Sequence, residues 1–138
     1  SMKKKVLKMI AAVAVPIVLL SLTFGVVHVS GVQSDSYSVM SIESSSGNHW
    51  NASYKKLSGN KKRDVSLYEG THRFAIEITT KSGELSLSIT GRDGTEYYKG
   101  TALPTSTFEV PVDLAAKDKL SIRVDAKDHS GGFKIRWE

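Results

Sequence analysis

The sequence predicts an all-β protein: an antiparallel β-sandwich of the jelly-roll kind, with about seven to nine strands, behind an apolar N-terminal helix. Residues 9–27 are almost wholly apolar, apolar and polar residues alternate in later segments, and the gaps between those segments are rich in glycine. Alternation with a period of two is typical of strands that bury one face and expose the other. The 138 residues suit a single folded domain.

The N-terminal segment has the composition of a membrane-crossing helix. Residues 9–27, with the sequence MIAAVAVPIVLLSLTFGVV, follow four lysines and contain no charged residue. As a helix they would extend about 28 Å, close to the hydrocarbon core of a bilayer, where Pro16 is tolerated. The preceding lysines indicate a cytoplasmic N-terminus. We therefore expect residues 1–31 to be a transmembrane anchor or a signal peptide cleaved after Gly31, and either one exports the rest of the chain.

Four segments of the exported part, 74–79, 85–90, 120–125 and 133–138, alternate without exception. The region 106–112 repeats the pattern but contains Pro111, which favours an edge strand. The inward positions of the four segments predict the core, namely Phe74, Ile76, Ile78, Leu85, Leu87, Ile89, Leu120, Ile122, Val124, Phe133, Ile135 and Trp137. This many apolar faces require two stacked sheets to exclude water.

Shorter strands are expected at 37–42, 50–57, 63–68 and 96–99. Turn residues at 81–84, 91–94 and 129–132 predict chain reversals between strands. The chain is thereby divided into residues 1–31 as signal or anchor, 32–47 as a linker with the first strand, and 48–138 as the sandwich.

Several of these stretches resemble a known group of proteins. They are Glu69-Gly70-Thr71-His72-Arg73-Phe74, the run 82–89, Asp93-Gly94, and 131–137 with the sequence GGFKIRW. The chain resembles small, uncharacterised exported or membrane-anchored β-sandwich proteins of Gram-positive bacteria, and is more distantly similar to pre-peptidase C-terminal domains and other jelly-roll accessory modules. The resemblance covers about residues 49–138. It implies the fold and no active site. Many such proteins carry a lipid-anchoring cysteine, which this chain lacks, so residues 9–27 are its candidate attachment.

Composition excludes several classes of function. The net charge of +5 arises mostly from the four N-terminal lysines, and from Gly31 onward 15 basic residues face 14 acidic ones. That balance excludes the basic stripe of a nucleic-acid-binding domain. The absence of cysteine excludes disulfides, cysteine-based zinc sites and a thiol nucleophile.

The motifs favour a non-catalytic protein without a cofactor. The sequence has no Gly-x-Ser-x-Gly nucleophile motif. The acidic candidates for glycoside cleavage fall at outward positions or turns: Glu77, Glu84, Asp93 and Glu96. The exported histidines, His49, His72 and His129, lack the i, i+2 spacing that places two metal ligands on one strand face. The turns 92–96 and 125–128 contain the carboxylates of a calcium loop, but each places a cation beside them, which disfavours calcium binding.

Two groups of residues are candidates for ligand binding. Trp50, Tyr54 and Tyr98 would stack on sugar rings, although Trp50 and Tyr54 share one strand face and would pack in the core if that face is the inner one. A basic group would contact anionic lipid headgroups or wall teichoic acid, the alternative being a solvated loop. It comprises Lys55, Lys56, Lys61, Lys62 and Arg63.

We therefore expect an exported domain, anchored in the membrane or secreted, that acts in binding or adhesion at the cell envelope. One alternative is a module that binds carbohydrate or a cell-wall polymer, and another is a small enzyme or enzyme inhibitor that uses the end loops. The expected partners are the membrane through residues 9–27 if these are retained, and an envelope glycan or protein, but no nucleic acid. The sequence leaves the oligomeric state open.

Overall fold

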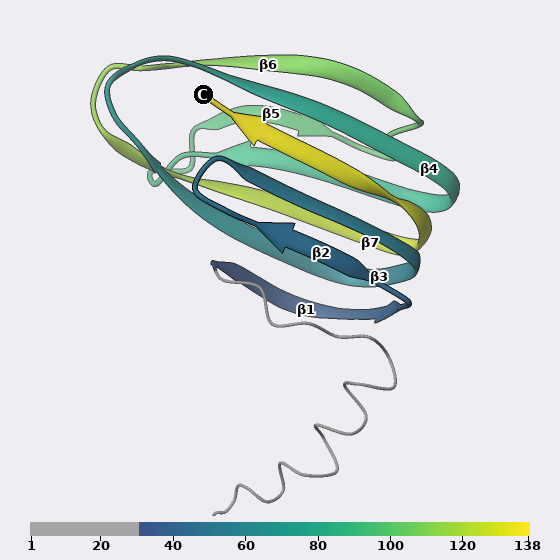
Figure 1. Cartoon of the computed structure of the whole chain (residues 1–138). Coiled ribbons are helices and arrows are strands. Elements are labelled where there is room, and N and C mark those ends of the chain that lie inside the picture. Colours follow the sequence, from purple (N-terminus) through teal and green to yellow (C-terminus); the bar gives the residue numbers. More distant parts are fainter. Residues whose placement is uncertain (1–30) are drawn as a thin grey trace, which may run out of the picture.

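Three long strands, each bent near its middle, pass through both layers of an antiparallel sandwich in a computed structural model that describes residues 31–138 (Figure 1). The apolar helix expected at residues 9–27 lies outside the described residues. Within residues 31–138, no helix is both long and apolar enough to span a bilayer. The strands are β1 (Val32–Val39), β2 (Ile42–Ser45), β3 (His49–Leu67), β4 (Gly70–Thr90), β5 (Glu96–Gly100), β6 (Ser106–Leu114) and β7 (Asp118–Trp137).

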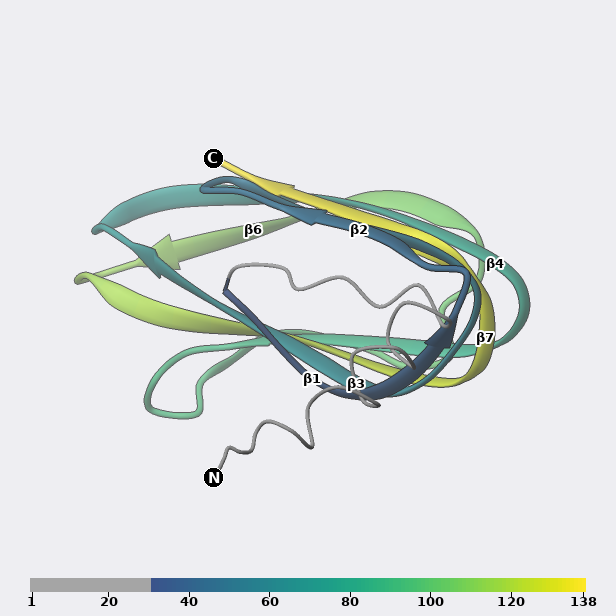
Figure 2. The same cartoon turned by 60° about the horizontal axis from the view of Figure 1, so that its bottom comes forward.

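Each layer contains one half of every long strand. In the β2 layer, the order is β2, the first part of β3, the last part of β7, the first part of β4, and β6. In the β1 layer, the order is β1, the second part of β3, the first part of β7, the second part of β4, and β5. Figure 2 shows the three long strands curving from one layer to the other at the same end of the molecule. The expected sandwich is thus present.

The bends replace two of the expected reversals. Residues 81–84 and 129–132 do not form hairpin turns, because β4 and β7 remain paired with each other on both sides of the bend. Register shifts in the pairing absorb the change of direction, as β-bulges do. Gly83 and Gly131 adopt positive φ values of 76° and 137° there, which glycine does without steric cost. The turn at 91–94, in contrast, does join β4 to β5.

The predicted core is confirmed. All the inward residues of the four alternating segments are buried, Trp137 included. Trp50, Tyr54, Leu57 and Val65 of β3 and Val110, Val112 and Leu114 of β6 complete most of the apolar interior. Pro111 lies in β6, which pairs with β4 and forms an edge of the β2 layer, so its missing N–H leaves no gap in a central ladder.

The first strand differs from the expectation. Residues 37–42 do not form one strand, because Met40 adopts a φ of 51° and breaks the extended backbone between β1 and β2. These two strands supply no residue to the buried apolar core, which begins at Trp50. Their inward side chains include Ser38 and Glu43, so the interior beneath them is polar.

We predict that the bend in β7 tolerates no side chain at Gly131. A Cβ atom there would collide with the carbonyl of Thr79, and the positive φ adds strain. Gly131→Ala should lower the free energy of unfolding by at least about 3 kcal/mol in urea denaturation. Gly47→Ala is the matched control, because a Cβ at Gly47 meets nothing within 4 Å, and it should leave stability within about 1 kcal/mol. Equal losses for the two variants would contradict this explanation of the bend.

Candidate binding face

The outer face of the β2 layer presents a row of polar side chains from four strands. Asn51 of β3 lies opposite Lys134 of β7, which lies opposite Glu77 of β4, which in turn lies opposite Thr107 of β6. In the adjacent row, His49 lies opposite Arg136, and Arg136 lies opposite Ala75. Because alternate residues of a strand share a face, these side chains all point away from the core.

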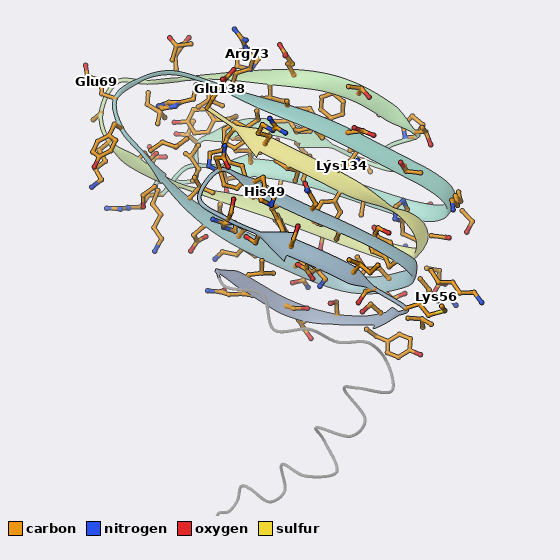
Figure 3. All side chains as sticks on the ribbon, in the orientation of Figure 1. His49, Lys56, Glu69, Arg73, Lys134 and Glu138 are labelled. Atoms are coloured by element: carbon orange, nitrogen blue, oxygen red, sulfur yellow. The ribbon has the colours of Figure 1, made fainter. Side chains whose placement is uncertain are left out.

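These residues line a shallow depression, which we call the outer trough. Its larger part has a volume of about 460 Å³ and is lined by His49, Asn51, Ala75, Ile76, Glu77, Thr107, Lys134, Ile135 and Arg136. A smaller part of about 140 Å³ shares Glu77 and Lys134 with it and extends over Gly131 and Gly132. Alanine and glycine leave the floor low between longer side chains. His49 and Lys134, which line the same hollow, can be followed in Figure 3.

The polar groups of the outer trough are available to a ligand. Within residues 31–138, the side chains of Asn51, Glu77, Lys134 and Arg136 form no hydrogen bond or ion pair with protein groups. The His49 ring is oriented by Ser46, 2.6 Å from Nδ1, and more weakly by Ser44, 3.5 Å from Nε2. The trough thus combines an ammonium, a guanidinium, an imidazole, an amide and a carboxylate, and it can both donate and accept hydrogen bonds.

The three aromatic candidates do not meet at the surface. Trp50 is fully buried and packs edge-on against Phe133, with ring centroids 4.9 Å apart. Tyr54 is also buried in the core. Tyr98 lies on β5 in the other layer, where it is half-buried against Phe108. The alternative of core packing therefore holds for Trp50 and Tyr54, and neither presents a ring face to a sugar.

The five basic candidates also separate. Lys55 and Lys56 are exposed at the bend of β3, and Lys62 extends outward with its ammonium 3.8 Å from Asp64. Lys61 points inward and is buried. Arg63 reaches across to the β2 layer, where it donates to the Ser46 carbonyl at 2.6 Å and lies over the Trp137 ring. Alternation along β3 places Lys61 and Lys62 on opposite faces, so the five basic residues do not form one surface.

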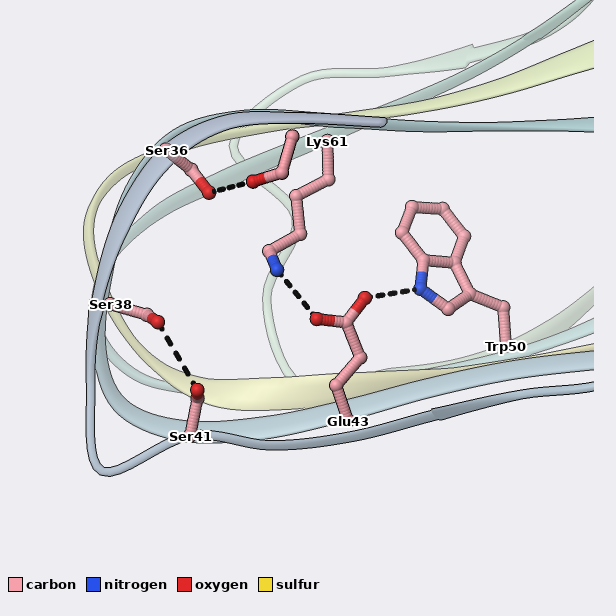
Figure 4. A network of polar contacts seen from close by, with 7 residues as sticks. Ser36, Ser38, Ser41, Glu43, Trp50 and Lys61 are labelled. Carbon is pink, nitrogen blue, oxygen red and sulfur yellow. Dashed lines mark hydrogen bonds and ion pairs between the residues drawn. The ribbon is translucent and has the colours of Figure 1, made fainter. Parts of the chain in front are cut away.

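Lys61 belongs to a buried polar network beneath β1 and β2 (Figure 4). Its Nζ lies 2.6 Å from Oε1 of Glu43, and Oε2 of Glu43 accepts the indole N–H of Trp50 at 2.8 Å. The side chains of Lys61 and Glu43 are only 10% and 6% exposed. The ion pair joins the second part of β3, in one layer, to β2, in the other. An electrostatic contact thus holds β2 in place where apolar packing would be usual.

A second buried network lies at the bends. Thr80 donates its one hydroxyl proton to the Leu103 carbonyl at 2.9 Å, so the 2.8 Å contact between Thr80 and His129 is a bond from Nε2–H of His129. Nδ1 of His129 then accepts the Tyr54 hydroxyl proton at 2.7 Å. Burial lowers the pKa of the His129 imidazole, and burial followed by the charge of Glu43 raises the pKa of the Tyr54 hydroxyl. These shifts favour a neutral imidazole and a neutral phenol, and in these forms the two side chains and Thr80 join the three bends.

Sequence reasoning assigned no role to the outer trough. It placed Glu77 at an outward position, but it could not identify Asn51, Lys134 and Arg136 as neighbours, because their proximity depends on the register of strands far apart in sequence. In the part of the chain that the structure describes, no three histidine or acidic side chains gather in a way that would hold a metal ion.

Comparison with known proteins gives similarity at the level of structure only. No protein-family model matches the chain, and no curated protein matches it. A secreted serine protease, VesC of Vibrio cholerae, is similar over 70% of this chain and 23% of its own, with a TM-score of 0.49 and 11% identity. The chain thus spans about a quarter of that protein.

Two further solved structures are similar over more of their own length. The C-terminal CBM6 of LamC, a marine laminarinase of Zobellia galactanivorans, is similar over 73% of this chain and 87% of its own, with a TM-score of 0.43 and 15% identity. The pre-peptidase C-terminal domain of a Bacillus anthracis collagenase is similar over 58% and 77%, with a TM-score of 0.43 and 10% identity. At these scores the function must be inferred from the chain's own geometry.

We predict that the buried ion pair is costly to break and cheap to replace as a unit. Lys61→Met leaves the Glu43 carboxylate buried without its partner and should lower the free energy of unfolding by about 3–5 kcal/mol. Adding Glu43→Gln removes that charge, keeps an acceptor for Trp50, and should restore most of the loss. Lys62→Met, beside a surface carboxylate, should cost under about 1 kcal/mol. A double variant no more stable than Lys61→Met would refute the assignment.

We predict a pH dependence of stability from His129. The unfolded chain binds a proton at this residue near its ordinary pKa of about 6.5, whereas burial lowers the pKa of the folded form. Stability is therefore highest above about pH 6.5 and falls on acidification toward the folded-state pKa, by up to about 1.4 kcal/mol per pH unit.

The measurement is a series of urea denaturation curves between about pH 7.5 and 5. In this pH range histidine is the main side chain that titrates. His129→Gln should be less stable at neutral pH and show a flatter dependence than the unmodified protein. His49→Gln, at the surface, serves as the control and should keep the steeper slope. An unchanged slope in His129→Gln would show that another group causes the effect.

Proposed function

We propose that this protein is a non-catalytic binding module of the cell envelope whose outer trough holds a segment of an extended polysaccharide. The observation that carries the proposal is the row of unpaired polar side chains across four strands, above a floor of small residues. A shallow open groove suits a polymer that lies across the sheet, whereas small-molecule sites are usually deeper and mostly apolar.

The side chains of the outer trough match the chemistry of a glycan. Sugar hydroxyls both donate and accept hydrogen bonds, and the trough offers donors from Lys134 and Arg136, an acceptor in Glu77, and both in the amide of Asn51. Hydrogen bonds that involve a charged protein group are the stronger ones, so Arg136 and Lys134 should contribute most. Alternating donors and acceptors favour a sugar chain over a purely anionic or purely cationic polymer.

The same residues support a non-catalytic role. Glu77 is the one carboxylate among the residues that line the outer trough. Glycoside hydrolysis ordinarily requires two carboxyl groups on opposite sides of the bond that is cut. A groove that presents a single carboxylate can hold a polysaccharide, but it lacks the pair needed to cleave one.

The proposal includes the cellular location. Residues 9–27 would act as a membrane anchor or export signal and place the sandwich outside the cell, as in the Gram-positive proteins that the sequence resembles. A retained segment would hold the module at the membrane, beneath the wall polymers that it binds. A cleaved segment would release it as a secreted protein.

The test is binding of the purified full chain, kept soluble in detergent, to isolated cell walls and to an array of envelope polysaccharides. Arg136→Ala and Asn51→Ala should weaken binding, the former by about tenfold or more, because a hydrogen bond to a charged group is lost. Arg123→Ala is the control, because Arg123 points outward from the β1 layer and pairs with Asp125 at 3.1 Å.

The outcomes separate this proposal from its alternatives. Binding that survives Arg136→Ala but is lost in Arg123→Ala would move the site to the other layer. Loss of binding in Tyr98→Ala alone would restore the aromatic-stacking hypothesis at β5. Failure to bind any wall polymer would refute the proposed function.

A further inference from the structure

The apolar side chains exposed to solvent are concentrated at one corner of the sandwich. Met40 and Ile42 are 70% and 76% exposed, and Tyr37 is 50% exposed. Together these three define what we call the β1–β2 corner. Among the described residues, the other large exposed hydrophobic side chain is Tyr68, which lies in the β3–β4 turn at the opposite end.

The β1–β2 corner wraps around the bend of β3. The pairing of β1 with β3 ends at Val39, opposite Lys56, and the pairing of β2 begins at Ile42, opposite Ser53. Between them Met40 has a φ of 51°, a left-handed conformation that is uncommon outside glycine, asparagine and aspartate. This turn carries the methionine to the apex of a convex corner instead of into the core.

The orientation of β2 reverses the ordinary pattern of apolar side chains inside and polar side chains outside. In β2, Glu43 faces the interior and Ile42 faces solvent, although a one-residue change of register would bury the isoleucine. The buried ion pair between Glu43 and Lys61 holds the strand in the reversed register. A fold that buries charge and exposes apolar groups on the same short strand keeps those apolar groups available for a partner.

The charge at this end of the molecule identifies the partner. The bends expose Lys55, Lys56, Lys81 and Lys127 against two acids, Glu84 and Asp128. The opposite end has no such excess, with Glu69, Asp93, Asp118 and Glu138 against Arg73, Arg92, Lys117 and Lys119. Figure 3 shows Lys56 at the first end and Glu69 at the other. The apolar corner therefore lies at the end of the sandwich that carries an excess of lysine.

We propose that the β1–β2 corner docks onto the surface of an anionic lipid bilayer, with Met40 and Ile42 entering the interfacial region and the surrounding lysines contacting phosphate headgroups. Three side chains are too few for a stable protein interface, which buries about 800 Å² on each partner. A convex apolar tip with adjacent lysines instead fits a membrane surface, where each near-surface lysine strengthens attraction about fivefold. The proposal does not rest on polysaccharide binding, and the residues changed in its test lie outside the outer trough.

The absence of cysteine allows a direct test on the full chain. Met40→Cys, labelled with an environment-sensitive fluorophore, is placed in lipid nanodiscs made of phosphatidylcholine alone or with about a third phosphatidylglycerol, a typical anionic content. Nitroxide-labelled lipids in the discs quench a fluorophore that touches the bilayer. Tyr68→Cys with the same label is the matched control, because Tyr68 is 73% exposed at the other end.

We expect blue-shifted, strongly quenched emission from the label at position 40 in anionic discs, little quenching in neutral discs, and little from the label at position 68 in either. Lys55→Glu with Lys56→Glu should reduce the docking equilibrium by at least about 25-fold. Arg92→Glu with Lys117→Glu should leave it unchanged. Circular dichroism confirms that each variant is folded.

Three results would overturn the proposal. The first is equal quenching at the two labelled positions, and the second is equal quenching at position 40 in neutral and anionic discs. The third is blue-shifted emission from position 40 in the lipid-free protein, which would indicate that residues 9–27 or a second copy of the chain covers the corner.

Discussion

The central constraint on this fold is that three strands must turn a corner together without losing their pairing. β3, β4 and β7 each belong to both layers, so their bends must coincide at one end of the molecule. Gly83 and Gly131 allow the backbones to approach, and His129 joins the three bends through Tyr54 and Thr80. The β1–β2 corner lies at that end, whereas the β3–β4 turn lies at the opposite one.

The core was predictable from the sequence because the period of two is a local property. Phe74 through Ile78 and Phe133 through Trp137 alternate in a way that only a half-buried strand satisfies. The continuity of the long strands was not predictable from local pattern. A segment such as 81–84 has the composition of a hairpin turn, and it forms a bend only because β7 runs beside it through the same change of direction.

The candidate site depended even more on long-range register. Lys61 and Lys62 are adjacent and chemically alike, yet one is buried against Glu43 and the other is at the surface. Trp50 was a candidate for sugar stacking with core packing as its alternative, and its face of β3 is the inner one. The outer trough combines Asn51, Glu77 and Lys134 from three strands, and no local signal marks such residues as neighbours.

The interactions that stabilise segment 32–47 differ from those in the rest of the domain. The strands from Trp50 onward contain the buried apolar side chains and carry the ordinary hydrophobic stability of a sandwich. β1 and β2 are held by backbone pairing, serine contacts, the partly buried Val32 and a single buried ion pair. Because none of the fully buried apolar residues comes from β1 or β2, Met40 and Ile42 are not constrained by core packing. Their exposure at a cationic end is then best explained by a contact outside the folded domain.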